Sequence, residues 1–288
     1  MLTIFITFSF GAIVGSFINV VTYRLPMIIQ KNWTKDSINF LKSQGISSTY
    51  LGDRHQHEEL NLLWPPSHCP HCKYRIKPWE NVPLLSYIFL KTKCSNCLRD
   101  IPFRYPLTEL LCGFMTIFLV YRFGLSLSSF AFMLLVWSLL TVTIIDFNHQ
   151  LIPDEITQPL IWLGLFFNAS VLKTEVNLNQ AVLGAILGYL SLWCVNWIFK
   201  VTRGKEGLGQ GDFKLLAAIG AWLGWQCLAA TIILSSLMGA IVGIYMVTIL
   251  EKNKNHPIPF GPYLSAAAFI FIIWGPEINN IYLTNIFR

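Results

Sequence analysis

Apolar residues occupy this chain in long blocks separated by short polar breaks. A block of about 20 residues is the length that a helix needs to cross the hydrocarbon core of a bilayer, which is about 30 Å thick. The pattern predicts about eight such spans: Leu2–Tyr23, Pro106–Phe123, Leu125–Ile145, Glu155–Leu172, Leu178–Phe199, Asp212–Trp225, Gln226–Leu250 and Ile258–Pro276. We therefore expect an all-α polytopic membrane protein.

The composition supports this interpretation. Hydrophobic residues make up 54% of the 288 residues and charged residues 12%, whereas soluble domains have about 25% charged residues. A signal peptide has a basic segment before its apolar run, and the first apolar block of this chain has none. We therefore expect it to stay in the mature chain as the first span.

The basic residues predict an orientation in the membrane. Lys and Arg gather in cytoplasmic loops, and 12 of the 21 lie from Arg24 to Arg104. Two later loops on the same side of an eight-span chain hold Lys200, Arg203, Lys205, Lys252 and Lys254. We expect these loops and residues 24–105 to be cytoplasmic, with both termini outside. Topology then explains the net charge of +6, so this charge does not indicate nucleic-acid binding.

The polar region 24–105 contains two Cys-x-x-Cys pairs. They are Cys69-Pro-His-Cys72 and Cys94-Ser-Asn-Cys97, with 21 residues between them, close to the spacing of structural zinc sites. Two disulfides, which a reducing cytoplasm disfavours, and four unligated thiols are the alternatives. We expect a small zinc-ribbon-like cytoplasmic lobe between the first and second spans, in which a structural Zn²⁺ bound by all four cysteines contributes folding energy.

Other residues are weaker ligand candidates. His68 and His71 flank the first cysteine pair and are alternative zinc ligands, although a histidine beside a zinc turn is more often a neighbour. The remaining cysteines lie in apolar spans, and we expect them to be small buried hydrophobic residues. They are Cys112, Cys194 and Cys227.

Two aspartates at the ends of spans are the main catalytic candidates, because an ionisable group in a membrane is costly and usually functional. Asp146 ends the third span, and Asp212 opens the sixth within Gly209-Gln-Gly211-Asp212. The expected topology brings both to the cytoplasmic edge. Two carboxylates held close together share a proton, so one activates water while the other polarises a scissile carbonyl. Taken alone, Asp212 also fits a helix N-cap.

Two other carboxylates rank below this pair. Asp154 follows Pro153 just before the fourth span and fits a helix cap. Glu109 lies near the start of the second span, close in sequence to Arg104. We expect these two to pair, which leaves Glu109 as a secondary candidate.

These features belong to a longer series of motifs that covers most of the chain. The motifs are Gly15-Ser16-Phe17-Ile18-Asn19-Val20, Tyr23-Arg24-Leu25-Pro26, Ser67-His68-Cys69-Pro70-His71-Cys72, Asn81-Val82-Pro83, Ser86-Tyr87, Cys94-Ser95-Asn96-Cys97, Ile101-Pro102-Phe103-Arg104-Tyr105-Pro106, Glu109-Leu110, Asp146, Leu151-Ile152-Pro153-Asp154 and Glu206-Gly207-Leu208-Gly209-Gln210-Gly211-Asp212-Phe213-Lys214-Leu215. In this order they resemble the prepilin peptidase family, or type IV leader peptidases, among the Gly-x-Gly-Asp intramembrane aspartic proteases. The joint match removes the capping interpretation of Asp212.

The resemblance implies a bifunctional enzyme of the bacterial inner membrane, with its N-terminus in the periplasm. Asp146 and Asp212 would cut the basic leader from type IV prepilins and type II secretion pseudopilin precursors after a glycine. The lobe would support methylation of the new N-terminus, with S-adenosylmethionine as methyl donor bound by residues that the sequence does not identify. The expected domains are a first transmembrane helix (1–23), the lobe (24–105) and the peptidase bundle (106–288). The expected partners are these precursors and membrane lipid, without nucleic acid.

One position departs from the family. Many bifunctional members have a glycine where Thr92 precedes Lys93 in this chain, which bears on the methyltransferase activity and leaves the protease untouched. The segment Met27–Pro66 resembles an insertion of many Gram-negative members and is expected to be partly helical.

Two other functions compete with an enzyme. A non-enzymatic membrane assembly scaffold, whose zinc-bound lobe docks a partner, would leave Asp146 and Asp212 without a role. A transporter should have polar or broken helices near the bilayer midplane, whereas the acidic residues here gather at one membrane edge.

Overall fold

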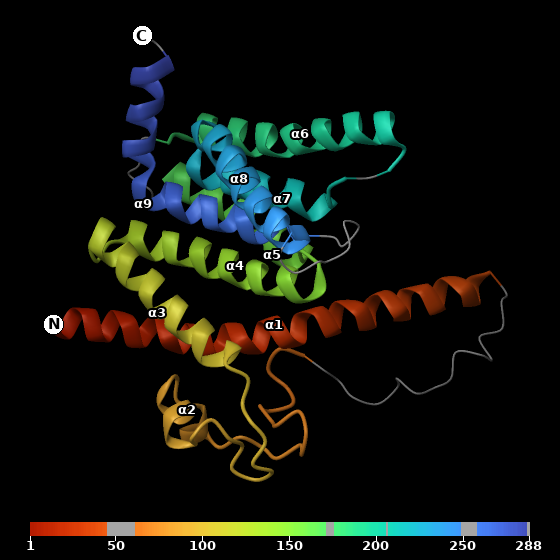
Figure 1. Cartoon of the computed structure of the whole chain (residues 1–288), viewed down its shortest axis with the longest axis vertical. Helices are drawn as coiled ribbons and strands as arrows, with labels where there is room; N and C mark the ends of the chain where they lie inside the picture. Colours follow the sequence, from red (N-terminus) through yellow and green to blue (C-terminus); the bar gives the residue numbers. More distant parts are fainter. Residues whose placement is uncertain (45–60, 171–175, 206, 249–257, 287–288) are drawn as a thin grey trace. The chain divides into compact units, whose positions relative to one another are not determined.

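The structure is a computed structural model that describes residues 1–44, 61–170, 176–205, 207–248 and 258–286. Over these residues it contains nine α-helices, which Figure 1 labels α1 to α9. One short 3₁₀ helix and two isolated β-bridges complete the secondary structure of these residues. The chain divides into two compact units, Met1–Met115 and Thr116–Arg288. The predicted all-α class is confirmed.

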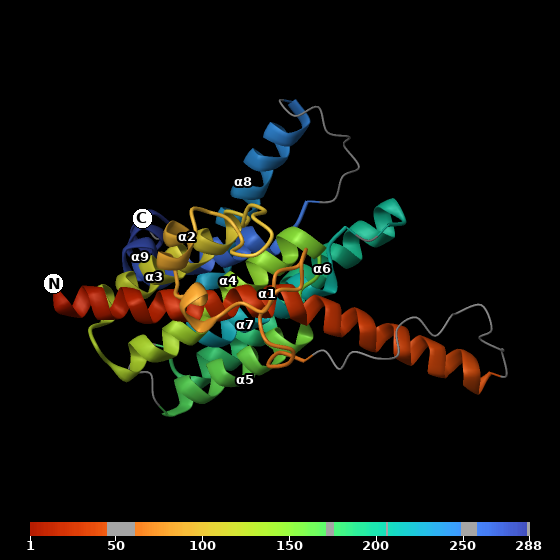
Figure 2. The ribbon, with the colours of Figure 1, turned by 90° about the horizontal axis from the view of Figure 1, so that it is seen from below.

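The first unit is built on α1 (Leu2–Ser43), a continuous helix of 42 residues (Figure 2). It contains the first predicted span and then extends through Pro26 into the segment predicted to be a partly helical insertion. The remainder of that insertion up to residue 60 lies outside the described residues. The first charged side chain of α1 is Arg24.

Helix α1 packs closely against the first part of α3 (Arg104–Phe123). At Gly15 a Cβ atom would lie 2.7 Å from the Cα of Glu109, so only glycine allows this approach of the two backbones. Beside it, the rings of Phe8 and Phe114 meet edge to face with centroids 5.5 Å apart. Small residues at helix contacts of this kind are typical of packing in membranes.

A buried arginine holds the chain where it returns toward α3. The guanidinium of Arg24 donates hydrogen bonds to the carbonyls of Asn61 and Leu62, both at 3.2 Å, and of Pro65, at 2.6 Å. Two short helices follow, η1 (Pro78–Asn81) and α2 (Leu85–Phe89). This part of the chain is therefore organised by hydrogen bonds and turns more than by a large apolar core.

The second unit is a helical bundle with α7 at its centre. Its helices are α4 (Leu127–His149), α5 (Asp154–Ser170), α6 (Leu178–Arg203), α7 (Gln210–Leu223), α8 (Gln226–Thr248) and α9 (Gly261–Ile286). Almost every side chain from Asp212 to Leu223 is buried. Helices α5 and α6 pack on α7, α8 packs on α9, and α9 packs on α4.

Close backbone contacts fix α7 against its neighbours. A Cβ atom on Gly184 of α6 or on Gly220 of α7 would collide with the carbonyl oxygen of the other. From α5, the Asn168 amide donates to the carbonyls of Ala221 and Trp222 at 2.9 and 3.1 Å. The position of α7, which carries Asp212 at its start, is thus fixed from two sides.

Within the part of the chain that the structure describes, six helices are long and apolar enough to cross a membrane. They are α1, α3, α4, α6, α8 and the Gly261–Ile278 part of α9. Helices α5 and α7 lie where two further spans were predicted, but they have only 17 and 14 residues, so the count of eight stays a prediction. Many large apolar side chains of α6 and α8 are exposed, as lipid-facing helices require. The chain is a multi-pass membrane protein.

Candidate functional site

Asp146 lies in the last turn of α4, and its side chain is only 5% exposed. Its Oδ2 accepts a hydrogen bond of 2.9 Å from the backbone N–H of Gly261, the first residue of α9. A Cβ atom on Gly261 would lie 2.7 Å from the same oxygen. The start of α9 is therefore fitted directly against this carboxylate.

Asp212 is the third residue of α7 and is 7% exposed. The N-cap position belongs to Gly209, and the carboxylate of Asp212 accepts a hydrogen bond from the backbone of that glycine. The other oxygen, Oδ1, is buried and has no hydrogen-bond partner among the described residues. A buried polar atom without a partner costs about 1–3 kcal/mol, so helix capping alone does not account for this side chain.

The two aspartates lie close enough for their charges to repel each other. Ile152, in the segment that joins α4 to α5, contacts both sides of the site. A Cβ atom on Gly211 would lie 2.6 Å from the Cβ of Ile152, and one on Gly261 would lie 3.1 Å from its Cδ1. The structure therefore brings together the two side chains that the sequence singled out, from helices far apart along the chain.

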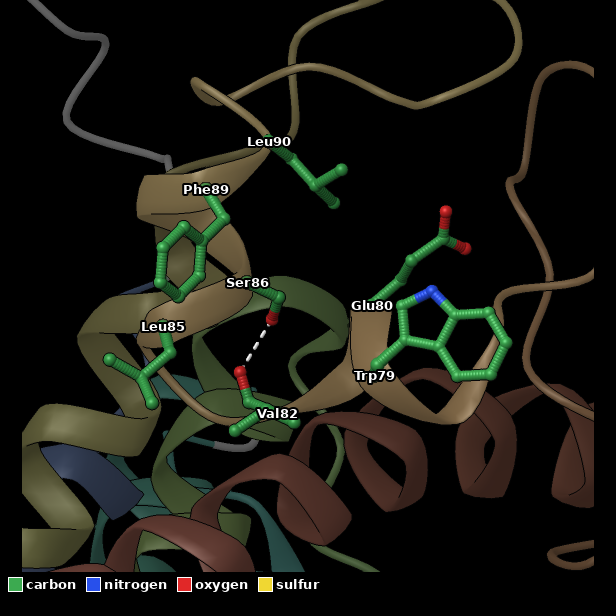
Figure 3. Close-up of a pocket in the computed structure, with 7 residues that line it drawn as sticks. All are labelled: Trp79, Glu80, Val82, Leu85, Ser86, Phe89 and Leu90. Carbon is green, nitrogen blue, oxygen red and sulfur yellow. Dashed lines mark hydrogen bonds between the residues drawn. The ribbon is translucent and has the colours of Figure 1, made fainter.

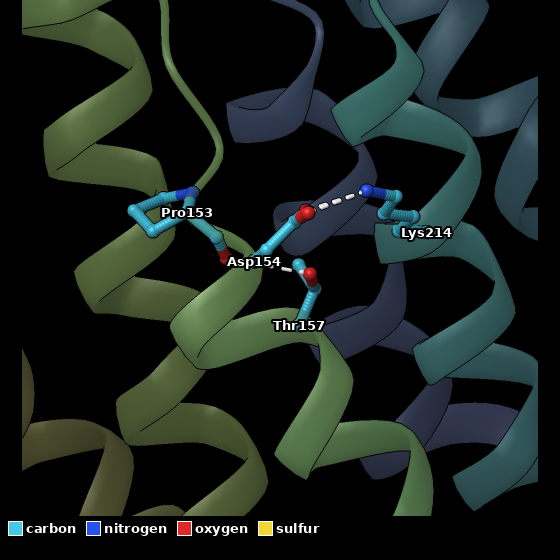
Figure 4. Close-up of polar contacts among 4 residues, drawn as sticks. All are labelled: Pro153, Asp154, Thr157 and Lys214. Atoms are coloured by element: carbon cyan, nitrogen blue, oxygen red, sulfur yellow. Dashed lines mark hydrogen bonds and ion pairs between the residues drawn. The ribbon is translucent and has the colours of Figure 1, made fainter. Parts of the chain in front are cut away.

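A bidentate ion pair lies next to this site. Lys214 donates from Nζ to both carboxylate oxygens of Asp154, at 2.7 and 2.6 Å (Figure 4). Asp154 was expected to be a helix cap, but it is the first residue of α5 itself, and its carboxylate is bound to Lys214. Nothing in the sequence indicates this partner. Because Lys214 lies two residues after Asp212, the pair ties the start of α5 to the first turn of α7.

Glu109 has a different role from the predicted one. Its carboxylate accepts hydrogen bonds from the backbone N–H of Leu84, at 2.8 Å, and from Ser16. Its expected partner, Arg104, lies over the ring of Tyr105, 5.1 Å from the ring centroid, and donates to the hydroxyl of that residue. Glu109 therefore links α1 and α3 to the turn that precedes α2.

The four cysteines of the two pairs meet at one point, with their Sγ atoms all within 4.8 Å of one another. Cys69 and Cys97 have their sulfurs 3.8 Å apart, and Cys72 and Cys94 have theirs 4.0 Å apart. Four sulfurs bound to zinc at about 2.3 Å would be about 3.8 Å apart in a tetrahedron. A disulfide needs a separation of about 2.05 Å. The donor set and its spacing thus fit a tetrahedral metal ion.

The two cysteine pairs have the same backbone geometry. In each pair the N–H of the first cysteine donates at 2.9 Å to the carbonyl five residues later, in Tyr74 and Arg99 respectively. The residue after the second cysteine is left-handed in both, with φ of 59° at Lys73 and 57° at Leu98. This repeated turn directs both thiols of each pair toward the common centre.

Hydrogen bonds prepare one of these thiols for ligation. The backbone N–H of Tyr74, with a smaller effect from the Asn96 side chain, lowers the pKa of Cys72 to about 6. The thiolate is the form of cysteine that binds a metal. The lowered pKa of Cys72 favours the thiolate that a zinc site requires. At Cys97 a backbone hydrogen bond from Arg99 acts in the same direction, but burial and the neighbouring thiols outweigh it and raise the pKa of Cys97 to about 11.

The two flanking histidines have partners outside the cysteine cluster. The Nδ1 of His68 lies 3.1 Å from the carbonyl oxygen of Pro66, and the Nδ1 of His71 lies 2.7 Å from the guanidinium of Arg99. Among the described residues, the group that fits a metal contains only the four cysteines.

Sequence reasoning did not single out Gly261, which contacts Asp146. It stands in Phe260-Gly261-Pro262 at the start of the last span, and a Gly-Pro pair is a turn signal. That signal indicates where a helix begins, but not which side chain meets its first N–H.

Comparisons with known proteins identify the family. Residues 9–123 match the family model described as Bacterial Peptidase A24 N-terminal domain, and residues 133–244 match the Type IV leader peptidase family. The prepilin leader peptidase/N-methyltransferase of Pseudomonas aeruginosa is 46% identical over 277 residues, 96% of this chain and 92% of the relative. Its namesakes from Stutzerimonas stutzeri (45% identical; 95% and 91% covered) and Legionella pneumophila (38%; 95% and 92%) are also similar. No solved structure matches the chain. With this identity over nearly its whole length, the chain belongs to the type IV leader peptidase family.

Proposed function

We propose that this chain is a membrane aspartic endopeptidase that also methylates its product. It removes the basic leader from type IV prepilins and type II pseudopilin precursors after a glycine, and then methylates the exposed N-terminus. One observation carries the peptidase proposal: two buried aspartates, Asp146 and Asp212, lie within electrostatic reach of each other, and Oδ1 of the second has no partner among the described residues. The names of the relatives contain the same two activities.

The surroundings of the two aspartates support different roles for them. The N–H of Gly261 stabilises a charged carboxylate at Asp146, so we assign the base to this residue. Two close carboxylates do not readily both ionise, so we assign the shared proton to Asp212. Asp146 takes a proton from water as the water oxygen adds to the scissile carbonyl, and Asp212 gives its proton to the carbonyl oxygen.

Collapse of the resulting tetrahedral species completes the cut. Its C–N bond breaks, the leaving amine receives the proton that Asp146 holds, and a hydroxyl of the intermediate returns a proton to Asp212. Both aspartates then have their starting protonation states, so no further reactant is needed.

Methyl transfer must follow cleavage, because the amine that accepts the methyl group is part of a peptide bond before the cut. S-adenosylmethionine is the second substrate and supplies this methyl group, while the amine loses a proton. We place this activity with the lobe of residues 24–105. The four cysteines of that lobe support a structural zinc ion, since their sulfur positions fit a tetrahedral site.

The proposed location is the bacterial inner membrane, with the lobe and the aspartates on the cytoplasmic side and the N-terminus in the periplasm. The distribution of Lys and Arg supports this orientation. The apolar helix of a precursor would enter the bundle from the lipid, while its basic leader stays in the cytoplasm. The cut then falls at the membrane edge.

Incubation of a pilin precursor and labelled S-adenosylmethionine with membranes that contain the chain tests both activities. Mass analysis should find loss of the leader and one added methyl group on the same product. A scaffold would leave the precursor intact. If the full precursor is not cut but a precursor supplied without its leader is methylated, only the transferase part of the proposal stands.

A further inference from the structure

One apolar surface of the first unit is explained by neither activity. It is formed by η1, α2 and the turn between them, and its side chains are largely exposed: Trp79 (68%), Val82 (39%), Leu85 (52%), Ile88 (69%) and Phe89 (80%). These five residues are named the α2 surface below. Trp79 lies across a hollow of about 370 Å³ from α2 (Figure 3). Neighbouring apolar side chains exposed to this extent indicate a binding surface.

The polar groups at the edge of the α2 surface already have partners inside the lobe. The Ser86 hydroxyl donates to the carbonyl of Val82 (Figure 3). The Glu80 carboxylate accepts hydrogen bonds from the N–H of Lys77, at 2.9 Å, and from the hydroxyl of Ser95, at 2.7 Å. The surface therefore suits an apolar environment better than a polar ligand.

The position of α2 along the membrane helices indicates which apolar environment surrounds the α2 surface. The N–H of Leu84, directly before α2, is bonded to Glu109 of α3, which lies against Gly15 of α1. Gly15 comes nine residues before Arg24, about 13 Å along a helix. All of α1 before Arg24 lacks charged side chains. Helix α2 thus begins beside the uncharged part of a membrane helix and not beyond it.

The charges around the α2 surface are mainly positive. Residues 61–105 contain seven Lys and Arg against two acidic side chains, a net charge of +5, which stays positive when a zinc ion with four thiolates adds two negative charges. Lys77 lies 5.5 Å over the ring of Trp79, and Lys91 and Lys93 closely follow α2. An apolar face with basic neighbours is typical of surfaces that insert into anionic leaflets, and tryptophan favours the membrane interface.

We propose that the α2 surface is inserted into the anionic phospholipid leaflet that borders the lobe. Trp79, Ile88 and Phe89 contact acyl chains, and the nearby lysines contact lipid phosphates. The lobe is then held against the bilayer, and only its remainder is in the aqueous phase. This inference concerns lipid contact and does not depend on the peptide that is cut.

Site-specific photocrosslinking of the full chain in vesicles tests the proposal. One variant has the photoreactive residue p-benzoylphenylalanine in place of Phe89, and the matched variant has it in place of Phe40, which is 64% exposed near the end of α1. Gel and mass analysis identify the adducts. We expect several-fold more phospholipid adduct at position 89 than at position 40, and more in vesicles with phosphatidylglycerol than in pure phosphatidylcholine.

Equal lipid adducts at both positions would overturn the proposal, as would independence from phosphatidylglycerol. Adducts at position 89 with a pilin precursor or a second copy of the chain, in place of lipid, would assign the surface to that partner instead. A conservative variant, Trp79→Phe, provides a second measurement. Brominated phospholipid quenches the fluorescence of tryptophans that contact acyl chains, so the quenching should be smaller in this variant by the contribution of Trp79. Unchanged quenching would contradict insertion. Precursor cleavage, measured in parallel, reports separately on the proposed function.

Discussion

The backbone N–H of Gly261 donates a 2.9 Å hydrogen bond to Oδ2 of Asp146, and this glycine has no space for a side chain on the side facing that carboxylate. The bond joins the end of α4 to the start of α9. It gives one aspartate of the proposed pair a fixed position and a partner that its counterpart, Asp212, lacks at Oδ1.

Gly261→Ala should lower the turnover of precursor cleavage by at least about tenfold, because displacement of a catalytic group by about 1 Å costs up to about a hundredfold. The new Cβ would lie 2.7 Å from Oδ2 of Asp146, so the carboxylate must move. In the control variant Gly243→Ala, the new Cβ meets only the flexible tip of Ile258, at 3.2 Å. Equal cleavage rates for the two variants would show that the Asp146 contact does not matter.

The ion pair between Asp154 and Lys214 should position the first turn of α7, which carries Asp212, and should contribute little to the stability of the fold. Its side chains are 49% and 27% exposed, and exposed pairs contribute about 0–1 kcal/mol to stability. We expect Lys214→Met to lower the cleavage rate about tenfold with little change in melting temperature. The exchanged pair Asp154→Lys/Lys214→Asp should recover part of the rate. Cleavage at the wild-type rate by Lys214→Met, or no recovery of the rate in the exchanged pair, would show that the ion pair does not position the site.

Metal analysis of the purified chain should find one zinc ion per molecule, absent from Cys94→Ser. Loss of a structural zinc removes folding energy, so this variant should have a destabilised lobe and little methyl transfer. Cys194→Ser is the matched control, because Cys194 is exposed on α6 and lies outside the cysteine cluster. Zinc retained in Cys94→Ser at the wild-type level would exclude the proposed ligand set.

Thr92→Gly should stabilise the lobe. Thr92 has φ of 65°, a left-handed conformation that costs a β-branched residue roughly 1–2 kcal/mol and glycine almost nothing. This geometry gives a physical reason for the glycine of many family members at this position. Denaturation should show a gain of about 1 kcal/mol, whereas Thr34→Gly, on the exposed face of α1, should lose about 0.3 kcal/mol, the difference between the helix propensities of Thr and Gly. Losses in both variants would contradict this account.

The sequence predicted those parts of the structure that depend on regular patterns. Apolar blocks located the helices, and the spacing of Cys69, Cys72, Cys94 and Cys97 predicted a cluster that the structure forms. The proximity of Asp146 and Asp212 followed from the expected topology, and the structure has it. Each of these inferences uses spacing along the chain, which a sequence contains directly.

Contacts between segments far apart along the chain could not be predicted from spacing in the sequence. Nothing in the sequence connects Gly261 to Asp146 or the N–H of Leu84 to Glu109, because each bond depends on where two helices cross. The expectation of a buried residue is confirmed for Cys112 and Cys227, but it is wrong for Cys194, which is exposed. An apolar span does not reveal which of its faces points to lipid.

The central claim is that Asp146 and Asp212 together cut the precursor. Its most direct test is leader removal by membranes that contain the wild type, Asp146→Asn or Asp212→Asn, since an amide keeps the shape of the side chain but cannot share a proton. We expect each variant to lose at least about a hundredfold in cleavage rate, and still to insert, fold and methylate a substrate supplied without its leader. Cleavage at nearly the wild-type rate by either variant would contradict the two-aspartate mechanism.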